Sequence, residues 1–186
     1  MCSCRIKSIV FISCCLLTVL TAWSTPLIAS DFVLVSPDFQ NGKSLPVWSV
    51  MKAAGGENLS PALEWSNPPE GTRSFALAVI DEHPVARRWV HWLVVNIPAD
   101  VRSLKRGASL KAMPDGATEL RNSYGFIGYG GPQPPPGTGP HRYVFTVYAL
   151  DVETVTVPES PDADEFEKAV KPHVLGTAKL IGIYER

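Results

Sequence analysis

Cysteine is missing from nearly all of this sequence. The chain has four cysteines, and all of them lie within its first 15 residues: Cys2, Cys4, Cys14 and Cys15. From residue 16 onward no thiol is present that could form a disulfide, act as a nucleophile or bind a metal. The rest of the chain must therefore be held together by its core alone.

The sequence also lacks any run of basic residues. Lys and Arg number 17 and Asp and Glu 18, and the first 30 residues contain two of the basic residues and none of the acids. The remaining chain therefore has 15 basic against 18 acidic residues, a formal charge of −3. Binding to nucleic acid without sequence preference is driven by basic charge, so nucleic acid is not an expected partner.

No apolar run is long enough to cross a membrane. The longest, Ile9 to Leu20, is shorter than the roughly 20 residues that a spanning helix needs. It follows the basic residues Arg5 and Lys7 and precedes a stretch of small residues that ends at Ser30. This layout is typical of a secretory signal peptide, and we expect cleavage near Ala29 or Ser30.

The expected organisation is a cleaved signal peptide at residues 1–30 and one domain at residues 31–186. The mature protein would be periplasmic or secreted, with no stable membrane span. A membrane anchor and a lipoprotein cut before Cys14 are the alternatives. The anchor is disfavoured by the short apolar run, and the lipoprotein cut would leave apolar Leu16 to Leu20 behind.

The pattern after residue 30 is mostly that of β-strands. Five segments are rich in β-branched, aromatic or aliphatic residues: 32–35, 73–80, 90–97, 143–150 and 177–184. The run Phe75 to Ile80 is continuously apolar, which indicates a strand that is buried on both faces. One helix is expected over Ala163 to Leu175, capped by an Asp and limited by Pro172. These elements predict one mostly-β domain, a β-sandwich or mixed sheet with a peripheral helix.

Polar and aromatic side chains gather at the ends of three predicted strands. Asp81 follows one strand directly, and His91 and His141 lie at the starts of the other two. Because side chains alternate along a strand, Trp89 shares a face with His91, and Tyr143 shares one with His141. If the first two strands are antiparallel neighbours, all five residues can line one pocket.

The residue types in this pocket favour an anion as ligand. Imidazole N–H groups can donate hydrogen bonds to oxyanions, and the two histidines are predicted to act in that way. If they do, affinity should rise as the pH falls toward the imidazole range near ~6.5. The alternative is that His91 and His141 are buried, hydrogen-bonded core residues without a ligand.

Three segments of the sequence resemble the phosphatidylethanolamine-binding protein family, in its bacterial Raf-kinase-inhibitor-like branch. The first is Asn58-Leu59-Ser60-Pro61-Ala62-Leu63-Glu64-Trp65. The second runs Trp89-Val90-His91-Trp92-Leu93-Val94-Val95-Asn96 and the third Pro134-Pro135-Pro136-Gly137-Thr138-Gly139-Pro140-His141-Arg142-Tyr143. The resemblance implies a phosphatidylethanolamine-binding-protein-like β-sandwich over the mature chain. It also implies a pocket for phosphate-type anions, lined by Asp81, Trp89, His91, Pro134, Pro135, His141 and Tyr143.

The sequence departs from the family pattern at the rim of this pocket. The family's usual Asp-Pro-Asp-Ala-Pro is replaced by Asp81-Glu82-His83-Pro84, which keeps the first Asp and is one residue shorter. His83 is expected either as a solvated loop residue or as a third imidazole near the pocket. Ligand preference is therefore not transferred from better-known relatives.

Two functions remain open from the sequence. The first is a non-enzymatic binder, without a cofactor, of an anionic ligand such as a phospholipid head group or a phosphorylated molecule. The resemblance implies that such a binder can also inhibit a partner protein. The alternative is a metal-dependent hydrolase in which Asp81, His91 and His141 hold a divalent ion, since two His and one carboxylate form a known catalytic metal set. The sequence predicts neither the ligand's identity nor the oligomeric state.

Overall fold

The structure is a computed structural model that describes Met1 and residues 31–186. The predicted signal peptide, apart from Met1, lies outside the described residues. The strands are β1 (Val33–Val35), β2 (Lys43–Ser44), β3 (Leu63–Ser66), β4 (Ser74–Asp81), β5 (Trp89–Pro98), β6 (Ser103–Leu104), β7 (Thr118–Glu119), β8 (His141–Leu150) and β9 (Val174–Tyr184). The α-helix is α1 (Ala163–Val170), and short 3-10 turns lie at Val47–Ser49, Lys52–Ala54, Pro84–Ala86 and Lys171–His173.

The strands form two sheets. The larger has the strand order β2-β9-β8-β4-β5-β7, and the smaller has the order β1-β3-β6. Strand β2 pairs with β9 in parallel, and the other pairs are antiparallel. The long strands β4, β5 and β8 therefore lie side by side in the middle of the larger sheet.

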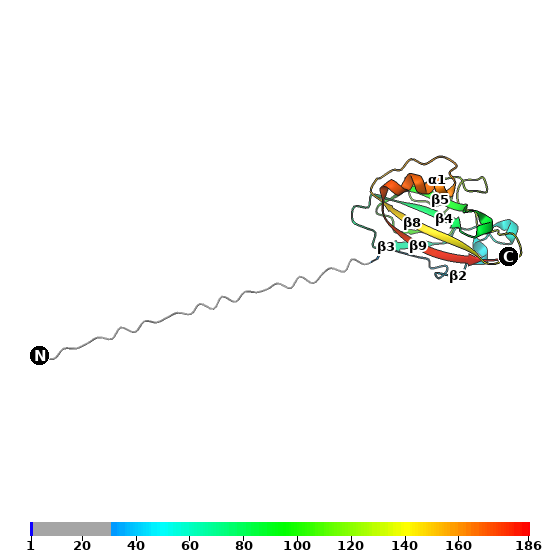
Figure 1. Cartoon of the computed structure of the whole chain (residues 1–186), viewed down its shortest axis with the longest axis horizontal. Helices are drawn as coiled ribbons and strands as arrows, with labels where there is room; N and C mark the ends of the chain where they lie inside the picture. Colours follow the sequence, from blue (N-terminus) through cyan, green and yellow to red (C-terminus); the bar gives the residue numbers. More distant parts are fainter. Residues whose placement is uncertain (2–30) are drawn as a thin grey trace.

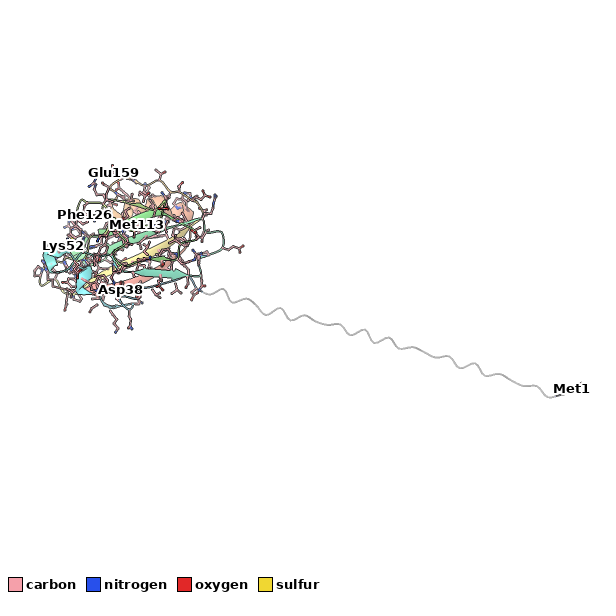
Figure 2. All side chains as sticks on the ribbon, turned by 180° about the vertical axis from the view of Figure 1, so that it is seen from behind. Met1, Asp38, Lys52, Met113, Phe126 and Glu159 are labelled. Carbon is pink, nitrogen blue, oxygen red and sulfur yellow. The ribbon has the colours of Figure 1, made fainter. Side chains whose placement is uncertain are left out.

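The larger sheet is covered on both faces. On one face it packs against the smaller sheet through a buried cluster that includes Leu34, Leu63, Trp65, Phe75, Val94 and Phe145. On the other face it packs against α1 through Ala78, Leu93, Leu150, Phe166 and Val170. Figure 1 shows α1 over β4 and β5, with β3 on the opposite side. Seen from behind, Glu159 before α1 and Asp38 after β1 lie on opposite sides of the domain (Figure 2).

The two-sided cover explains the composition of β4. Every residue from Ser74 to Asp81 is buried, as the continuous apolar run in the sequence predicts. The predicted mostly-β sandwich with a peripheral helix is confirmed. Each of the five predicted strands is present, and their observed ends differ from the predicted ones by a few residues.

The helix is shorter than predicted. It ends at Val170, and residues Lys171–His173 form a 3-10 turn that leads directly into β9 at Val174. Pro172 is the physical reason, because it has no N–H with which to continue the α-helical hydrogen bonds. At the other end Asp162 caps the helix: its side chain accepts the backbone N–H of Glu165, whose own side chain accepts the N–H of Asp162.

Candidate functional site

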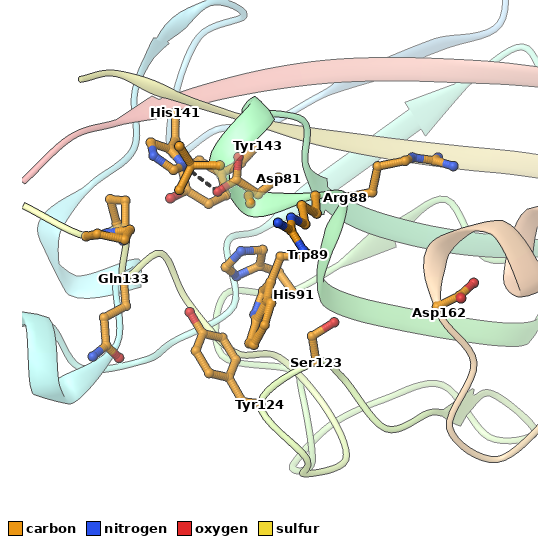
Figure 3. A pocket seen from close by; sticks show the side chains of 15 residues that line it. Asp81, Arg88, Trp89, His91, Ser123, Tyr124, Gln133, His141, Tyr143 and Asp162 are labelled. Atoms are coloured by element: carbon orange, nitrogen blue, oxygen red, sulfur yellow. Dashed lines mark hydrogen bonds and ion pairs between the residues drawn. The ribbon is translucent and has the colours of Figure 1, made fainter. Parts of the chain in front are cut away.

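All seven residues predicted to bind a ligand line one cavity of about 560 Å³ at the ends of β4, β5 and β8. We call this cavity the histidine pocket. Figure 3 shows His91 near its centre, with Asp81, Tyr143 and His141 on one side and Tyr124 and Ser123 on another. Its lining residues are Asp81, Val85, Ala86, Arg87, Arg88, Trp89, His91, Ser123, Tyr124, Gln133, Pro134, Pro135, His141, Tyr143 and Asp162.

Strand pairing brings the polar residues together. Asp81, the last residue of β4, lies opposite Trp89 of β5 and opposite Tyr143 of β8. The two pairings are antiparallel, so the end of β4 meets the starts of both neighbours, as the sequence analysis assumed. The pocket therefore opens at one edge of the larger sheet, where the three strand ends meet.

A β-bulge in β5 sets the position of His91. The pairing with β4 passes from Val79 opposite Trp92 to Ile80 opposite Val90, so His91 is the extra residue with no partner in β4. Bulges redirect side chains and are frequent beside functional sites. Freed from the β4 ladder, the backbone oxygen of His91 accepts the N–H of Gly130 at 2.8 Å.

The His91 ring makes a second hydrogen bond to the same residue. Its Nδ1 lies 2.6 Å from the carbonyl oxygen of Gly130, and a carbonyl oxygen can only accept, so Nδ1 carries the proton. The side chain is almost fully buried, and burial lowers the pKa of His91 to about 4. The carbonyl groups of Gly130 and Gly131 and the charge of Asp81 act in the opposite direction but are outweighed.

This state corrects the role predicted for His91. A neutral ring with its proton on Nδ1 presents a bare lone pair at Nε2, so it accepts hydrogen bonds. The residue types in the sequence predict instead that His91 donates to an anion and gains charge near ~6.5. With a pKa of about 4, His91 stays neutral across that range.

The second histidine is bound within the protein. Nδ1 of His141 lies 2.6 Å from Oδ2 of Asp81, and both side chains are buried. Nε2 of His141 lies 2.9 Å from the hydroxyl oxygen of Thr138, which donates to the carbonyl oxygen of Pro135. Both ring nitrogens of His141 therefore have partners within the protein. The ring forms part of the pocket wall and has no polar atom left to contact a ligand.

Asp81 is equally engaged. Its second oxygen, Oδ1, accepts the backbone N–H of His83 at 2.9 Å. The ring of His83 stacks on that of His141, with 3.9 Å between the ring centroids. His83 is therefore a third imidazole beside the pocket, the second of its two expected positions. An anion entering the pocket meets a carboxylate whose oxygens are already hydrogen-bonded.

An aromatic wall completes the pocket. Tyr124 packs edge-on against both Trp89 and His91, and its hydroxyl donates to the carbonyl oxygen of Gly131 at 3.0 Å. A side chain at Gly130 would come within 3 Å of the Tyr124 ring, so this close packing requires glycine. Tyr124, Ser123 and Gln133 also line the pocket but were not predicted, because they come from loops whose path carries no periodic signal.

Two arginines stand in the connection from β4 to β5. Arg88 is paired with Asp164 and Glu167, so it ties the rim of the pocket to α1. Arg87 is exposed and lines the pocket, and no acidic side chain among the described residues lies within 4.0 Å of it. Both adopt a left-handed backbone, with φ of 51° and 59°, which is uncommon for residues other than glycine.

The metal-site alternative finds no support in this geometry. Asp81 and His141 are bound to each other, and each has its remaining polar atom satisfied by the protein. Within residues 31–186, no group of three or more His, Cys, Asp or Glu side chains is arranged to hold a metal ion. The described helices also include none with the length and apolar character needed to cross a membrane.

Comparisons with known proteins agree with the resemblance. The family model described as phosphatidylethanolamine-binding protein matches residues 35–185. The UPF0098 protein YbhB of Escherichia coli K12 is 40% identical over 156 residues, which covers 81% of this chain and 98% of the relative. LppC of Mycobacterium tuberculosis H37Rv, whose name describes a lipoprotein, is 36% identical over 163 residues, covering 87% of this chain and 77% of the relative.

Two solved structures share the fold. The crystal structure of E. coli YbcL, described as a new member of the mammalian PEBP family, matches with a TM-score of 0.79 and 36% identity. That match covers 84% of this chain and 99% of YbcL. A homolog of phosphatidylethanolamine-binding protein from Chlamydia trachomatis matches with a TM-score of 0.69 and 33% identity, covering 83% of this chain and 97% of the homolog.

The low pKa of His91 predicts how stability depends on pH. In the unfolded chain this histidine takes up a proton near ~6.5, whereas in the folded protein it stays neutral down to about 4. Its contribution is therefore complete above pH ~6.5, and up to about 3 kcal/mol is lost as the pH falls toward 4. His91→Gln removes this loss, so the free energy of unfolding of the variant should fall less steeply over that interval.

Urea unfolding of both proteins at several pH values between 7.5 and 4 measures the effect. Groups common to both proteins cancel in the difference between wild type and His91→Gln. A difference in unfolding free energy that stays constant with pH would show that His91 titrates alike in the folded and unfolded states.

Proposed function

This chain belongs to the phosphatidylethanolamine-binding protein family, and from that membership and the pocket geometry we propose an exported, non-enzymatic binder of a small, phosphate-bearing anion. One observation carries the proposal. The predicted ligand-binding residues line a single cavity whose inner end has polar atoms and whose side wall is aromatic. Such a pocket suits a ligand with a polar head and a less polar body.

The charges around the pocket support an anion over a cation. Arg87 and Arg88 line the cavity, and the carboxylate of Asp81 is enclosed by its two hydrogen bonds. Asp162 lies at the far end from His141 and is occupied in capping α1 (Figure 3). Because Arg88 is paired with α1, Arg87 is the cation best placed to attract an entering anion.

Binding is favoured over metal-dependent hydrolysis by the state of two of the three residues that would hold the metal. Asp81 and His141 are hydrogen-bonded to each other. Asp81 also accepts the backbone N–H of His83, and His141 also contacts Thr138, so these atoms are not free to bind a metal. The family's name describes binding as well. Metal analysis of the purified protein tests this point: tightly held stoichiometric metal would favour the hydrolase. The inhibition of a partner protein rests on the family resemblance alone.

Titration with inorganic phosphate, followed by calorimetry at low salt, tests the binding function. Wild type should bind phosphate saturably, and Arg87→Glu should weaken binding roughly threefold to tenfold, because the charge at the entrance is reversed. The loss should shrink in 0.5 M salt, since exposed charges are screened. Arg73→Glu is the matched control: Arg73 immediately precedes β4, at the opposite end from Asp81, and its exposed side chain pairs with Glu153.

If wild type and Arg87→Glu bind phosphate with equal affinity at low salt, Arg87 does not attract the anion as proposed. The absence of saturable phosphate binding to wild type at any pH from 5.5 to 8 would contradict the binding function itself.

Export is supported by the layout of residues 1–30 and by the likeness to a relative named as a lipoprotein. We expect the protein recovered from outside the cytoplasm to begin within a few residues of Asp31, without any cysteine. N-terminal sequencing and intact mass measure this directly. A mature form that still contains residues 1–15 would contradict the predicted cleavage.

A further inference from the structure

We propose that Asn58 is a positioning residue for His91, because its side-chain amide fixes the backbone segment that holds the imidazole ring. Asn58 is not among the residues that line the histidine pocket, and it lines a separate cavity of about 210 Å³. The inference rests on the proposed function, since the ring that is positioned lines the proposed binding pocket. It goes further by naming a residue outside the pocket on which the state of that ring depends.

The segment that holds the ring is residues 129–132. It belongs to no helix or strand, yet every N–H and C=O group of its backbone has a hydrogen-bond partner. Gly130 bonds to His91 twice: its N–H donates to the backbone oxygen of His91, and its carbonyl oxygen lies 2.6 Å from Nδ1. The direction of the Gly130 carbonyl therefore decides whether Nδ1 of His91 has an acceptor.

Asn58 binds the same two peptide groups from the other side. Its Nδ2 donates to the carbonyl oxygen of Tyr129 at 3.1 Å, and its Oδ1 accepts the N–H of Gly131 at 2.7 Å. The peptide group that joins Tyr129 to Gly130 thus has its C=O on Asn58 and its N–H on His91. The peptide group that joins Gly130 to Gly131 has its C=O on His91 and its N–H on Asn58.

This arrangement fixes the Gly130 carbonyl because a trans peptide group is planar, with its C=O and N–H pointing in opposite directions. Neither peptide group can rotate to turn the carbonyl away from His91 without also breaking a hydrogen bond to Asn58. The amide of Asn58 cannot be turned around, since the carbonyl oxygen on one side only accepts and the N–H on the other only donates. One side chain therefore holds the acceptor that His91 needs.

The other side chains that bond to the segment do not replace Asn58. Ser109 accepts the N–H of Tyr129, and Tyr124 donates to the carbonyl oxygen of Gly131. Neither of these backbone atoms belongs to the two peptide groups that flank residue 130. Without Asn58, the described residues would provide no hydrogen bond to these two groups apart from those of His91.

The backbone explains why this position is an asparagine. Asn58 has a φ of 59°, in the left-handed region that Asn adopts several times more often than most residues other than glycine. Its N–H donates to the carbonyl oxygen of Val50 at 2.9 Å. Gly56 packs so closely on that carbonyl that a Cβ would lie 2.3 Å from the oxygen. Asn combines tolerance of this backbone with a donor and an acceptor on a short side chain.

The variant Asn58→Gly tests the positioning role, because glycine adopts the left-handed backbone and removes both hydrogen bonds. In wild type the ring of His91 should carry its proton on Nδ1. In the variant a measurable share of the rings should carry it on Nε2, because the hydrogen bond to the other nitrogen sets the tautomer. Nitrogen-15 NMR of histidine-labelled protein at pH 7, without ligand, measures the two populations.

Hydrogen exchange gives a second readout at an atom that Asn58 does not contact. The N–H of Gly130 should exchange at least about tenfold faster in Asn58→Gly than in wild type, relative to the N–H groups of β4, because the segment has lost two hydrogen bonds. The N–H groups of β4 report the change in overall stability. A variant that lowers overall stability without releasing the segment would leave this ratio unchanged.

Asn67→Gly is the matched control. Asn67 also has a left-handed backbone, with a φ of 54°, and its Nδ2 also donates to a backbone carbonyl oxygen, that of Asp31 at 3.3 Å. It lies between β3 and β4 and does not line the histidine pocket. This variant should keep the wild-type tautomer of His91 and the wild-type exchange of Gly130. Equal changes in both variants, or no change in either, would overturn the inference.

Wild type alone also decides the question, so a variant that does not fold leaves the test intact. The N–H of Gly130 bonds to His91 and the N–H of Gly131 bonds to Asn58. If both residues hold one segment, the two N–H groups should be protected from exchange to within about tenfold of each other, because they open together. A Gly131 N–H that exchanges more than tenfold faster than that of Gly130 would show that Asn58 does not hold the segment.

Titration with inorganic phosphate separates this inference from the proposed function. Asn58→Gly should bind phosphate about threefold or more weakly than wild type, because a pocket that is not preorganised must be ordered on binding. Asn67→Gly should bind as wild type does. If wild type binds no phosphate between pH 5.5 and 8, the proposed function fails, and the tautomer and exchange data still decide the role of Asn58 in positioning His91. An unchanged phosphate affinity in Asn58→Gly would overturn its role in binding.

Discussion

The hydrogen bond from Nδ1 of His91 to the carbonyl oxygen of Gly130 is the contact on which the character of the pocket depends. It lies at a bulge in β5, where the backbone oxygen of His91 also accepts the N–H of Gly130. Gly130 in turn must be glycine, since the Tyr124 ring packs where a Cβ would lie. One local irregularity of a buried strand thus sets the tautomer of the imidazole, the path of the loop and the aromatic wall.

Other polar groups of the pocket are hydrogen-bonded to one another. Asp81 holds His141 and the backbone of His83, and Thr138 joins His141 to the Pro134–Pro135 segment. Removing one partner of this buried pair would leave the other polar side chain without its hydrogen bond, which lowers stability. The pair therefore acts as scaffold.

Much of this arrangement could be predicted from the sequence. The continuous apolar run of β4 indicated a strand covered on both faces, and residues at strand ends indicated where a pocket would form. The family resemblance added Pro134 and Pro135, which no periodicity argument could place. These predictions work because a buried strand fixes the positions of its ends, and the strand ends position the side chains.

Other features could not be predicted for physical reasons. The bulge at His91 depends on how two strands share hydrogen bonds, and strict alternation does not reveal it. The protonation state of His91 depends on burial and on one carbonyl group 39 positions away in the sequence. Tyr124 comes from a loop held by Asn122, whose side chain accepts the Tyr124 N–H and donates to the carbonyl oxygen of Gly128. Its position follows from these tertiary contacts, which no local pattern encodes.

The most direct test of the account is the tautomer of His91 in the free protein. Nitrogen-15 NMR of the protein labelled at histidine, recorded at pH 7 without ligand, reports which ring nitrogen carries the proton. The account predicts a neutral ring for His91, protonated at Nδ1 and bare at Nε2. A ring protonated at Nε2 alone, or at both nitrogens, would contradict it.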